Sequence, residues 1–309
     1  MHGSDAPYDE DRRHPGSTNG RRQDAQNCQL CGTAPLERFE TTRGVVMWRC
    51  PQCGLYQNGM LCANEQYDGQ YHDIYVHRLP HKVVTAAARL SRVAGLAKQS
   101  RPRMLEVGCS LGATLEAAAA RGWDAVGVDV SRDAVEFCRG RGLNSVAVDG
   151  RTLPFDDGSF DVLASWHVIE HVPDVQEALA EWRRVLRPGG VMMLETPDAS
   201  CLKVRRLGPR YTKFWKPEHI YTFTPATLRG FLERAGFELL RPPLFGRIQD
   251  LPLNQACYAV GHQLLDGLMY VTGLRKAFQV FARRIETVPA IVPFQGRGNA
   301  ERSQVRRAA

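Results

Sequence analysis

The feature that most constrains the fold of this chain is an alternation of short apolar runs with helical stretches, which begins near residue 103. Five runs have the length of strands, at 104–107, 125–129, 145–149, 160–165 and 191–196. Apolar residues recur at helical spacing near 112–121, 132–140 and 175–186. This alternation predicts an α/β domain in which helices cover both faces of a parallel sheet.

Local signals mark the ends of the predicted helices. Asp174 and Glu177 have the spacing of a capping pair at the start of the third helix, and the Pro-Gly-Gly stretch at 188–190 is expected to end it. Thr224 and Pro225 have the N-cap and first-turn positions of a later helix, which places His219 on the loop before that helix.

Ligands of such sheets bind beyond the carboxyl ends of the strands. The predicted strand ends carry glycines and polar side chains, namely Glu106, Gly108, Gly112, Asp129, Asp149 and Ser165. The loop from Gly108 to Gly112 lacks the three regularly spaced glycines of a dinucleotide site, so it offers less of the close backbone approach that a pyrophosphate requires. A nucleoside without phosphates fits better, because Asp129 can accept from ribose hydroxyls and Asp149 from an adenine amino group.

Four cysteines near the start of the chain have the spacing of a structural zinc site. Two CxxC pairs are separated by 18 residues, and their cysteines are Cys28, Cys31, Cys50 and Cys53. Such pairs supply four thiolates that close a tetrahedron around zinc and leave no open coordination position. A glycine follows each pair, and the residues between the pairs alternate like a hairpin with its turn near residue 44.

Composition excludes some classes of protein. The chain has 309 residues, 43% of them hydrophobic, and a net charge of +7. No apolar run reaches the ~18–20 residues of a membrane-spanning helix. Residues 1–27 lack the apolar stretch of a secretory signal and are expected to be a disordered leader. These features predict a cytoplasmic protein with reduced cysteines, and its positive charge suits an acidic partner.

Successive stretches of the chain also resemble one known family. Over about 103–240, in order, they read LEVGCSLG, VGVDVS, AVDGRTLPFDDGSFDVLASWHVIEHVPD, VLRPGGVMMLETP and PEHIYTFTPATLRGFLERAGF. They are similar to the motifs of class I S-adenosylmethionine-dependent methyltransferases, and most similar to the branch with ubiquinone-biosynthesis O-methyltransferases and natural-product and sugar methyltransferases. Some members of that branch resemble this chain in carrying a zinc ribbon in front.

The resemblance implies a Rossmann-like core that binds S-adenosylmethionine, and it argues against a dehydrogenase. By this resemblance, Glu106, Gly108 and Gly112 contact the methionine part of the cofactor, Asp129 the ribose, and Asp149 with Gly150 the adenine. The expected cofactor-binding set also includes Cys109, Val130 and Ser165. Glu106 departs from the family pattern, because many members have Asp there.

Three histidines are candidate catalytic residues. His167 and His171 follow the fourth predicted strand and His219 follows the fifth, where an acceptor would be held. Methyl transfer needs alignment and exclusion of water, and it needs a base when the acceptor atom carries a proton. In ubiquinone-biosynthesis relatives, an acid plus a Glu-His pair at this position is associated with a divalent cation. Glu170-His171 resembles the pair, but His167 stands where the further acid would be.

Two other segments have open roles. The stretch 203–216 is basic and aromatic, which suits a lid over an anionic acceptor or a solvated flap. Residues 254–285 have helical spacing interrupted at Gly273 and are expected to pack on the core, to form a dimer face, to act as a lid or to contact a membrane surface. The seventh strand expected of the family is not evident in residues 298–309.

The sequence therefore predicts a class I methyltransferase core with a small zinc ribbon before it and helices after it. The expected segments are a leader 1–27, a ribbon 28–62, a helical connector 63–100, a core 101–245, a helical extension 246–290 and a basic tail 291–309. The expected acceptor is a small molecule, anionic or saccharide-, lipid- or quinone-like. The alternative is an RNA methyltransferase that grips RNA with its ribbon and basic segments, which the small number of arginines in the ribbon disfavours.

Overall fold

The computed structural model describes residues 27–58, 76–148, 152–212, 214–241, 246–272 and 274–286. The leader up to residue 26, the whole basic tail at 291–309, Asp149 and Gly150 lie outside these residues. The described part of the chain forms two sheets, a large one in the α/β core and a small one at the ribbon.

The core sheet has seven strands in the order β10-β11-β8-β7-β4-β5-β6. They are β4 (Arg103–Val107), β5 (Asp124–Asp129), β6 (Ser145–Ala147), β7 (Phe160–Trp166), β8 (Leu186–Pro197), β10 (Phe237–Leu240) and β11 (Ala277–Arg284). The strands from β6 to β8 are parallel, as predicted, and β11 is inserted antiparallel between β8 and β10.

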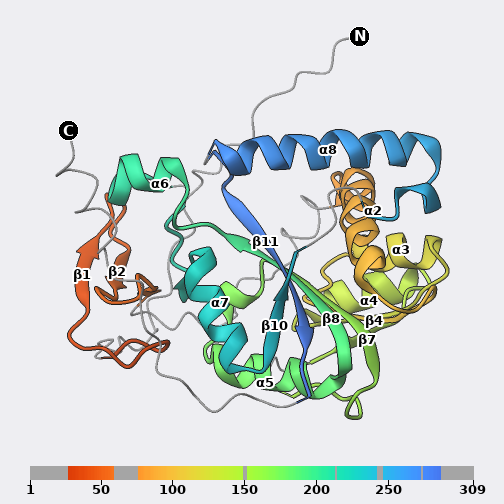
Figure 1. Ribbon diagram of the computed structural model, residues 1–309, viewed down its shortest axis with the longest axis horizontal. Helices are drawn as coiled ribbons and strands as arrows, with labels where there is room; N and C mark the ends of the chain where they lie inside the picture. The colour runs from red at the N-terminus through yellow and green to blue at the C-terminus, as the bar shows by residue number, and fades with distance from the viewer. Residues whose placement is uncertain are drawn as a thin grey trace, which may run out of the picture.

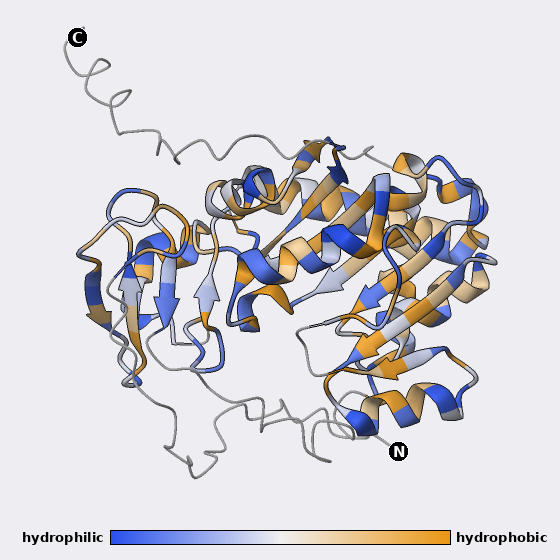
Figure 2. Cartoon of the chain, turned by 90° about the horizontal axis from the view of Figure 1, so that it is seen from below, coloured by the Kyte–Doolittle hydropathy of each residue, from blue (hydrophilic) through white to orange (hydrophobic). Residues whose placement is uncertain are grey.

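Among the described residues, five helices cover the two faces of this sheet, namely α2 (Leu79–Leu96), α3 (Ala113–Ala120), α4 (Arg132–Gly140), α5 (Val175–Val185) and α7 (Pro225–Arg234). Helix α6 (Leu202–Leu207) packs against the ribbon, and α8 (Leu253–Val271) packs on α2. Alternate strand residues enter two separate clusters: Met104 packs with α2 and α3, and its neighbour Leu105 packs with α5 and α7. This period of two places a buried layer on each side of the sheet. Figure 2 shows hydrophobic segments along the core strands.

Helix starts follow their local sequence. Asp174 accepts from the main-chain N–H of Glu177 at the start of α5, as predicted. Thr224 and Thr227 form a capping box at the start of α7, with Pro225 in the first turn. The Pro-Gly-Gly stretch at 188–190 does not end α5: the helix stops at Val185, and these residues belong to β8.

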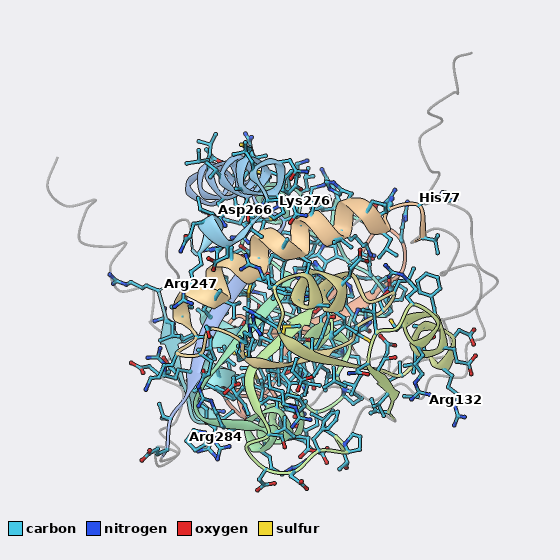
Figure 3. The ribbon with its side chains drawn as sticks, turned by 90° about the vertical axis from the view of Figure 1, so that its right-hand side faces the viewer. His77, Arg132, Arg247, Asp266, Lys276 and Arg284 are labelled. Atoms are coloured by element: carbon cyan, nitrogen blue, oxygen red, sulfur yellow. The ribbon has the colours of Figure 1, made fainter. Side chains whose placement is uncertain are left out.

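The predicted helical extension is partly wrong. Residues Leu253–Val271 form α8, which lies across the outside of α2 (Figure 1). Residues Ala277–Arg284, expected to continue the helix, form β11, which is the seventh strand. Figure 3 shows Lys276 near α8 and Arg284 at the opposite end, so β11 runs along the sheet away from α8. Both faces of β11 carry buried side chains, because Phe278 and Phe281 enter different hydrophobic clusters, so its sequence lacks the simple period of two that marks a half-buried strand.

The ribbon consists of β1 (Glu37–Glu40), β2 (Val46–Arg49) and β3 (Tyr56–Asn58). β1 and β2 form the predicted hairpin, with Gly44 in its turn at φ 77°. A fourth strand, β9 (Tyr221–Thr222), comes from the core and pairs with β3. The small sheet is therefore built from two distant parts of the chain, and Figure 1 shows the ribbon beside α6.

Within the described residues, none of the helices combines the length and apolar character that a membrane crossing requires.

Candidate functional site

The loop after β4 can be formed only with glycine at two positions. Gly108 and Gly112 both have φ of 77°, a left-handed conformation that side chains disfavour. A Cβ added to Gly108 would lie 2.2 Å from Val168 Cγ2, and one added to Gly112 would lie 2.7 Å from Leu143 Cδ1. Because neither glycine has a side chain, the main chain of this loop lies close to Val168 and Leu143 at the carboxyl edge of the sheet.

Glu106 is a buried carboxyl with an unused acceptor atom. Its side chain is at the end of β4 and 2% exposed, and its Oε2 has no hydrogen-bond partner. Burial raises the pKa of Glu106 to about 8. An unpaired buried carboxyl oxygen in a native fold calls for a partner, and the described residues do not supply one. A cationic ligand group beside the glycine loop would supply it.

Asp129 ends β5 and links the glycine loop to the next strand. Its Oδ2 accepts from the N–H of Ser110 at 2.8 Å, and its Oδ1 accepts from the N–H of Ser131 at 2.9 Å. Burial raises the pKa of Asp129. Each carboxylate oxygen has a second lone pair, so the side chain can still accept from a ligand hydroxyl.

The other predicted cofactor residues differ in how they are presented. Ser165 is buried at the end of β7 with an unpartnered Oγ. Val130 is 36% exposed directly after Asp129. The side chain of Cys109 is buried, and its atoms lie beside Gly127. Only the main chain of Cys109 is therefore available to a ligand at the glycine loop.

His167 joins two buried carboxylates. Its φ is 55°, and its ring nitrogens lie 3.2 Å from Glu170 Oε1 and 3.2 Å from Glu195 Oε1. Burial disfavours the charged ring, but the hydrogen bonds to these two carboxylates outweigh it and raise the pKa of His167 to about 9. His167 is therefore an imidazolium at neutral pH with both nitrogens engaged, which makes it a poor general base.

The two carboxylates are fixed by further partners. Glu195, on β8, forms an ion pair with Arg89 of α2 and accepts from Gln279 at 2.7 Å. Glu170 accepts from Thr196 Oγ1 at 2.9 Å. Sequence reasoning missed Glu195, although it lies near the end of a predicted strand, as Glu106 does. Nothing local in the sequence indicates Arg89, because it comes from a helix outside the predicted core.

His171 and His219 contact each other on the other side of Glu170. Their ring centroids are 4.9 Å apart with planes at 79°. His171 Nδ1 donates to the carbonyl of Glu218 at 3.0 Å. His219 is 6% exposed, and its Nδ1 has no partner. Burial lowers the pKa of His219 to about 3, so this ring is neutral at physiological pH.

The ligand atoms of Glu170, His171 and His219 all lie within 4.8 Å of one another. Two imidazole nitrogens and a carboxylate are suitable donors for a divalent cation. The same arrangement suits an acceptor hydroxyl, because the free nitrogen of the neutral His219 ring can accept its proton and the Glu170 carboxylate partly offsets the cost of burying the charge. The third donor of this group is His219, a residue that the sequence analysis considered for catalysis and not for metal binding.

The four cysteines of the ribbon meet at one point. The sulfur–sulfur distances are 3.5 Å for Cys28–Cys53 and 3.5 Å for Cys31–Cys50, and all four sulfurs lie within 4.8 Å of one another. A tetrahedral zinc site with Zn–S bonds of about 2.3 Å has sulfurs roughly 3.8 Å apart. The glycines after each pair have φ of 75° and 79°, as tight knuckles require. The residues present therefore fit a four-coordinate metal.

The aromatic residues of the basic stretch do not form an exposed lid. Phe214 and Trp215 are 6% and 3% exposed, and Trp215 packs against Phe39 and Tyr56 of the ribbon, with ring centroids 5.2 and 5.1 Å away. The cations of α6 and the following turn are exposed, namely Lys203, Arg205, Arg206 and Arg210. The segment thus attaches the ribbon through its aromatic side chains and presents its charges to solvent.

The core sheet is mainly parallel, with seven strands of which one is reversed. A glycine loop follows β4, and acids stand at the ends of β4 and β5. These features define the class I fold of S-adenosylmethionine-dependent methyltransferases. The chain belongs to the family described as "Methyltransferase domain", whose profile matches residues 75–241.

Named relatives agree with this assignment. The chain is 33% identical over 168 residues to a ubiquinone biosynthesis O-methyltransferase of Xanthomonas oryzae pv. oryzae, covering 49% of this chain and 69% of the relative. It is 33% identical over 181 residues to a probable S-adenosylmethionine-dependent methyltransferase of Mycolicibacterium smegmatis, covering 57% of this chain and 62% of the relative.

A third relative is an uncharacterized 37.1 kDa protein in a transposon of Streptomyces fradiae, 39% identical over 140 residues, with 42% of this chain and 41% of the relative covered. Among solved structures, an S-adenosylmethionine dependent methyltransferase from Mesorhizobium loti superposes with a TM-score of 0.48 at 21% identity, covering 64% of this chain and 98% of that one.

Proposed function

We propose that this protein transfers a methyl group from S-adenosylmethionine to a small-molecule acceptor. The observation that carries the proposal is the buried, unpartnered Oε2 of Glu106 beside the glycine loop. That position calls for a cationic group, and the α-ammonium group of the methionine part of the cofactor is one. The matched methyltransferase relatives support the same assignment.

The residues at the carboxyl edge are suited to holding the cofactor. Glu106, Gly108 and Gly112 would hold the methionine part, Asp129 the ribose, and Val130, Ser165 and the main chain of Cys109 would line the site. Asp149 and Gly150 are proposed for the adenine and lie outside the described residues. When bound, S-adenosylmethionine supplies an electrophilic methyl group on a sulfonium centre, so the protein has mainly to align the acceptor and exclude water.

On the acceptor side, we assign the base to His219. The ring is neutral and buried, with one nitrogen free of partners. The carboxylate of Glu170 favours the protonated ring, and His171, through Glu218, fixes the loop. His167 serves instead as a fixed cation between Glu170 and Glu195. A base placed in this way supports an acceptor whose reacting atom carries a proton, such as a hydroxyl.

The proposed acceptor is saccharide-, lipid- or quinone-like, or anionic. The Xanthomonas relative, named as a ubiquinone biosynthesis O-methyltransferase, supports a small hydroxylated acceptor. The exposed cations of α6 support an anionic one. Peripheral membrane contact through 254–285 also remains a proposal. It is supported by exposed leucines of α8, but β11 cannot take part because it lies within the sheet.

The RNA alternative has no observation in its favour. Two of the three ribbon arginines form ion pairs, Arg38 with Glu40 and Arg49 with Glu37. The ribbon therefore lacks the open basic face that a nucleic-acid grip requires.

We further propose that the four cysteines bind a structural zinc ion, which contributes folding energy that so small a unit needs. The segment boundaries at 28–62, 63–100 and 101–245 are kept as proposals, with the core now extended to include β11.

The test is a screen of cell-extract fractions with S-adenosylmethionine labelled in its methyl group. We expect label to enter a saccharide, lipid or soluble-metabolite fraction and to survive nuclease. The variant His219→Ala should abolish the labelling, whereas His81→Gln, an exposed histidine on α2, should leave it unchanged. Label that disappears on nuclease treatment would overturn the small-molecule proposal.

A further inference from the structure

The loop that carries His219 is held from outside the core, by the ribbon. Asn58, the last residue of β3, donates through its main-chain N–H to the carbonyl of Ile220 at 2.8 Å. Its side-chain Nδ2 donates to the carbonyl of Pro217 at 2.7 Å. These two carbonyls belong to residues before and after His219 in the chain. One ribbon residue therefore holds the main chain on both sides of the candidate base.

The rest of the ribbon reinforces this grip. β3 pairs with β9, matching Gln57 with Tyr221 and Tyr56 with Thr222. The interior of the ribbon is continuous with the core, because Cys50 and Leu55 share a buried cluster with Ile220 and Tyr221.

Asn58 is also close in sequence to the metal-binding cysteines, five residues after Cys53. The main-chain N–H of Cys50 donates to the carbonyl of Leu55 at 2.8 Å, which ties the second knuckle to the start of β3. Asn58 itself pairs with Met47 of β2. The position of Asn58 thus depends on the knuckle and the hairpin together.

A buried asparagine is costly unless its polar atoms are paired, and Asn58 is only 7% exposed. An apolar residue would pack at this place without that requirement. The amide donates to the carbonyl of Pro217, a bond that strand pairing alone would not supply.

We propose that Asn58 is a positioning residue for His219, and that the ribbon is a structural part of the acceptor site and not a separate binding module. The inference rests on the proposed function in one respect, namely that His219 contacts the methyl acceptor. Loss of the Asn58 side-chain bond should free the loop 217–220 and expose the histidine ring.

Two variants test this without knowledge of the acceptor. Asn58→Ala removes the side-chain bond, and Asn58→Asp keeps the shape but replaces the donor by an acceptor that faces the Pro217 carbonyl. Asn144→Asp, an exposed site on the loop before β6, is the matched control.

The probe is diethylpyrocarbonate, which modifies accessible neutral imidazoles, read residue by residue by peptide mass spectrometry. In the wild-type protein we expect His219 to react at least about tenfold more slowly than exposed His81. In both Asn58 variants the His219 rate should rise about fivefold or more, with zinc content, S-adenosylhomocysteine binding and the His81 rate unchanged. Wild-type His219 rates in both variants would overturn the proposal.

A second measurement covers variants that fail to fold or to hold zinc. Zinc is removed from the full wild-type chain with a chelator, and amide hydrogen exchange is followed by mass spectrometry. We expect residues 216–222 to lose protection together with 46–58, while 103–130 stay protected. Continued protection of 216–222 after the ribbon has opened would contradict the proposal. Neither readout involves methyl transfer, so their failure is distinct from failure of the proposed function.

Discussion

The imidazole rings of His171 and His219 meet edge to face, with centroids 4.9 Å apart, although 47 residues separate them in the chain. The contact joins the turn after β7 to the loop before β9. It places a hydrogen-bonded histidine against an unpartnered one, with the Glu170 carboxylate beside both. Of the two, only His219 Nδ1 is buried without a partner, which is why we assign the base to His219.

The first prediction concerns His219 itself. His219→Ala should reduce methyl transfer by about 10²- to 10⁴-fold, the usual contribution of a general base. The affinity for S-adenosylhomocysteine should be unchanged, because the ring is on the acceptor side. Because the pKa of His219 is lowered to about 3, its protonation should not reduce kcat, measured at saturating S-adenosylmethionine and acceptor, as the pH falls from 8 to 5. Labelled-methyl assays and calorimetry measure the two effects, and an equal loss of cofactor binding would refute the assignment.

The second prediction concerns the pH dependence of cofactor binding. The raised pKa of Glu106, about 8, means that its carboxyl is neutral at pH 6, whereas a cationic ligand group requires the ionised form. If only that form binds, affinity for S-adenosylmethionine should rise roughly fifty-fold between pH 6 and pH 8. Glu106→Gln should weaken binding and flatten this profile. Glu136→Gln, at an exposed site on α4, should change neither the affinity nor its pH dependence. Calorimetry at several pH values measures the affinity of each variant for S-adenosylmethionine.

The third prediction uses the same carboxyl as a stability probe. A carboxyl whose folded pKa is raised opposes folding as the pH rises through its unfolded value near 4.5, and the effect is complete above its folded value of about 8. In the ligand-free protein, Glu106→Gln should therefore raise Tm by several degrees at pH 8.5 and change it little at pH 4.5. A Tm difference that does not depend on pH would show that burial of this charge is not the cause.

The fourth prediction concerns His167 between its two carboxylates. A histidine with a raised pKa stabilises the fold fully below its unfolded pKa near 6.5, and loses this contribution as the pH rises through about 9. His167→Gln should cost about 1–2 kcal/mol of unfolding free energy at pH 6, a figure reduced because nearly half of the side chain is exposed. The deficit should shrink by pH 9.5 in denaturant titrations. A loss of unfolding free energy that is the same at pH 6 and at pH 9.5 would contradict this explanation.

The fifth prediction concerns metal content. The purified protein should contain one zinc ion per chain, and Cys50→Ser should lose it and lower Tm, because a structural site contributes folding free energy. Cys257→Ser, at an exposed cysteine on α8, is the matched control and should keep both. If Cys50→Ser instead keeps one metal ion per chain and His219→Ala loses it, the metal is bound by Glu170, His171 and His219.

The glycine loop and the acids at the strand ends could be predicted from the sequence because their signals are local. Glu106, Gly108, Gly112 and Asp129 follow the ends of short apolar runs, and parallel strands bring those ends to one edge. The two CxxC pairs likewise encode their own knuckles, whose glycines have the expected left-handed conformation.

The helix-like interpretation of residues 277–284 was wrong for a physical reason. A strand that buries side chains on both faces, as β11 does with Phe278 and Phe281, has no simple period of two that the sequence would reveal. Only its pairing with β8 and β10 makes it a strand. The role of Arg89 was equally hidden, since its partner Glu195 is 106 residues away.

The sequence by itself determined the α/β class, the positions of the glycine loop and its acids, and the cysteine pairs, because each depends on neighbours within a few residues. Only the tertiary structure decided which histidine lies between two carboxylates and which is buried with a free nitrogen, and that the ribbon holds the loop that carries His219. Those properties arise from burial and from contacts between distant segments, which no local pattern of residues encodes.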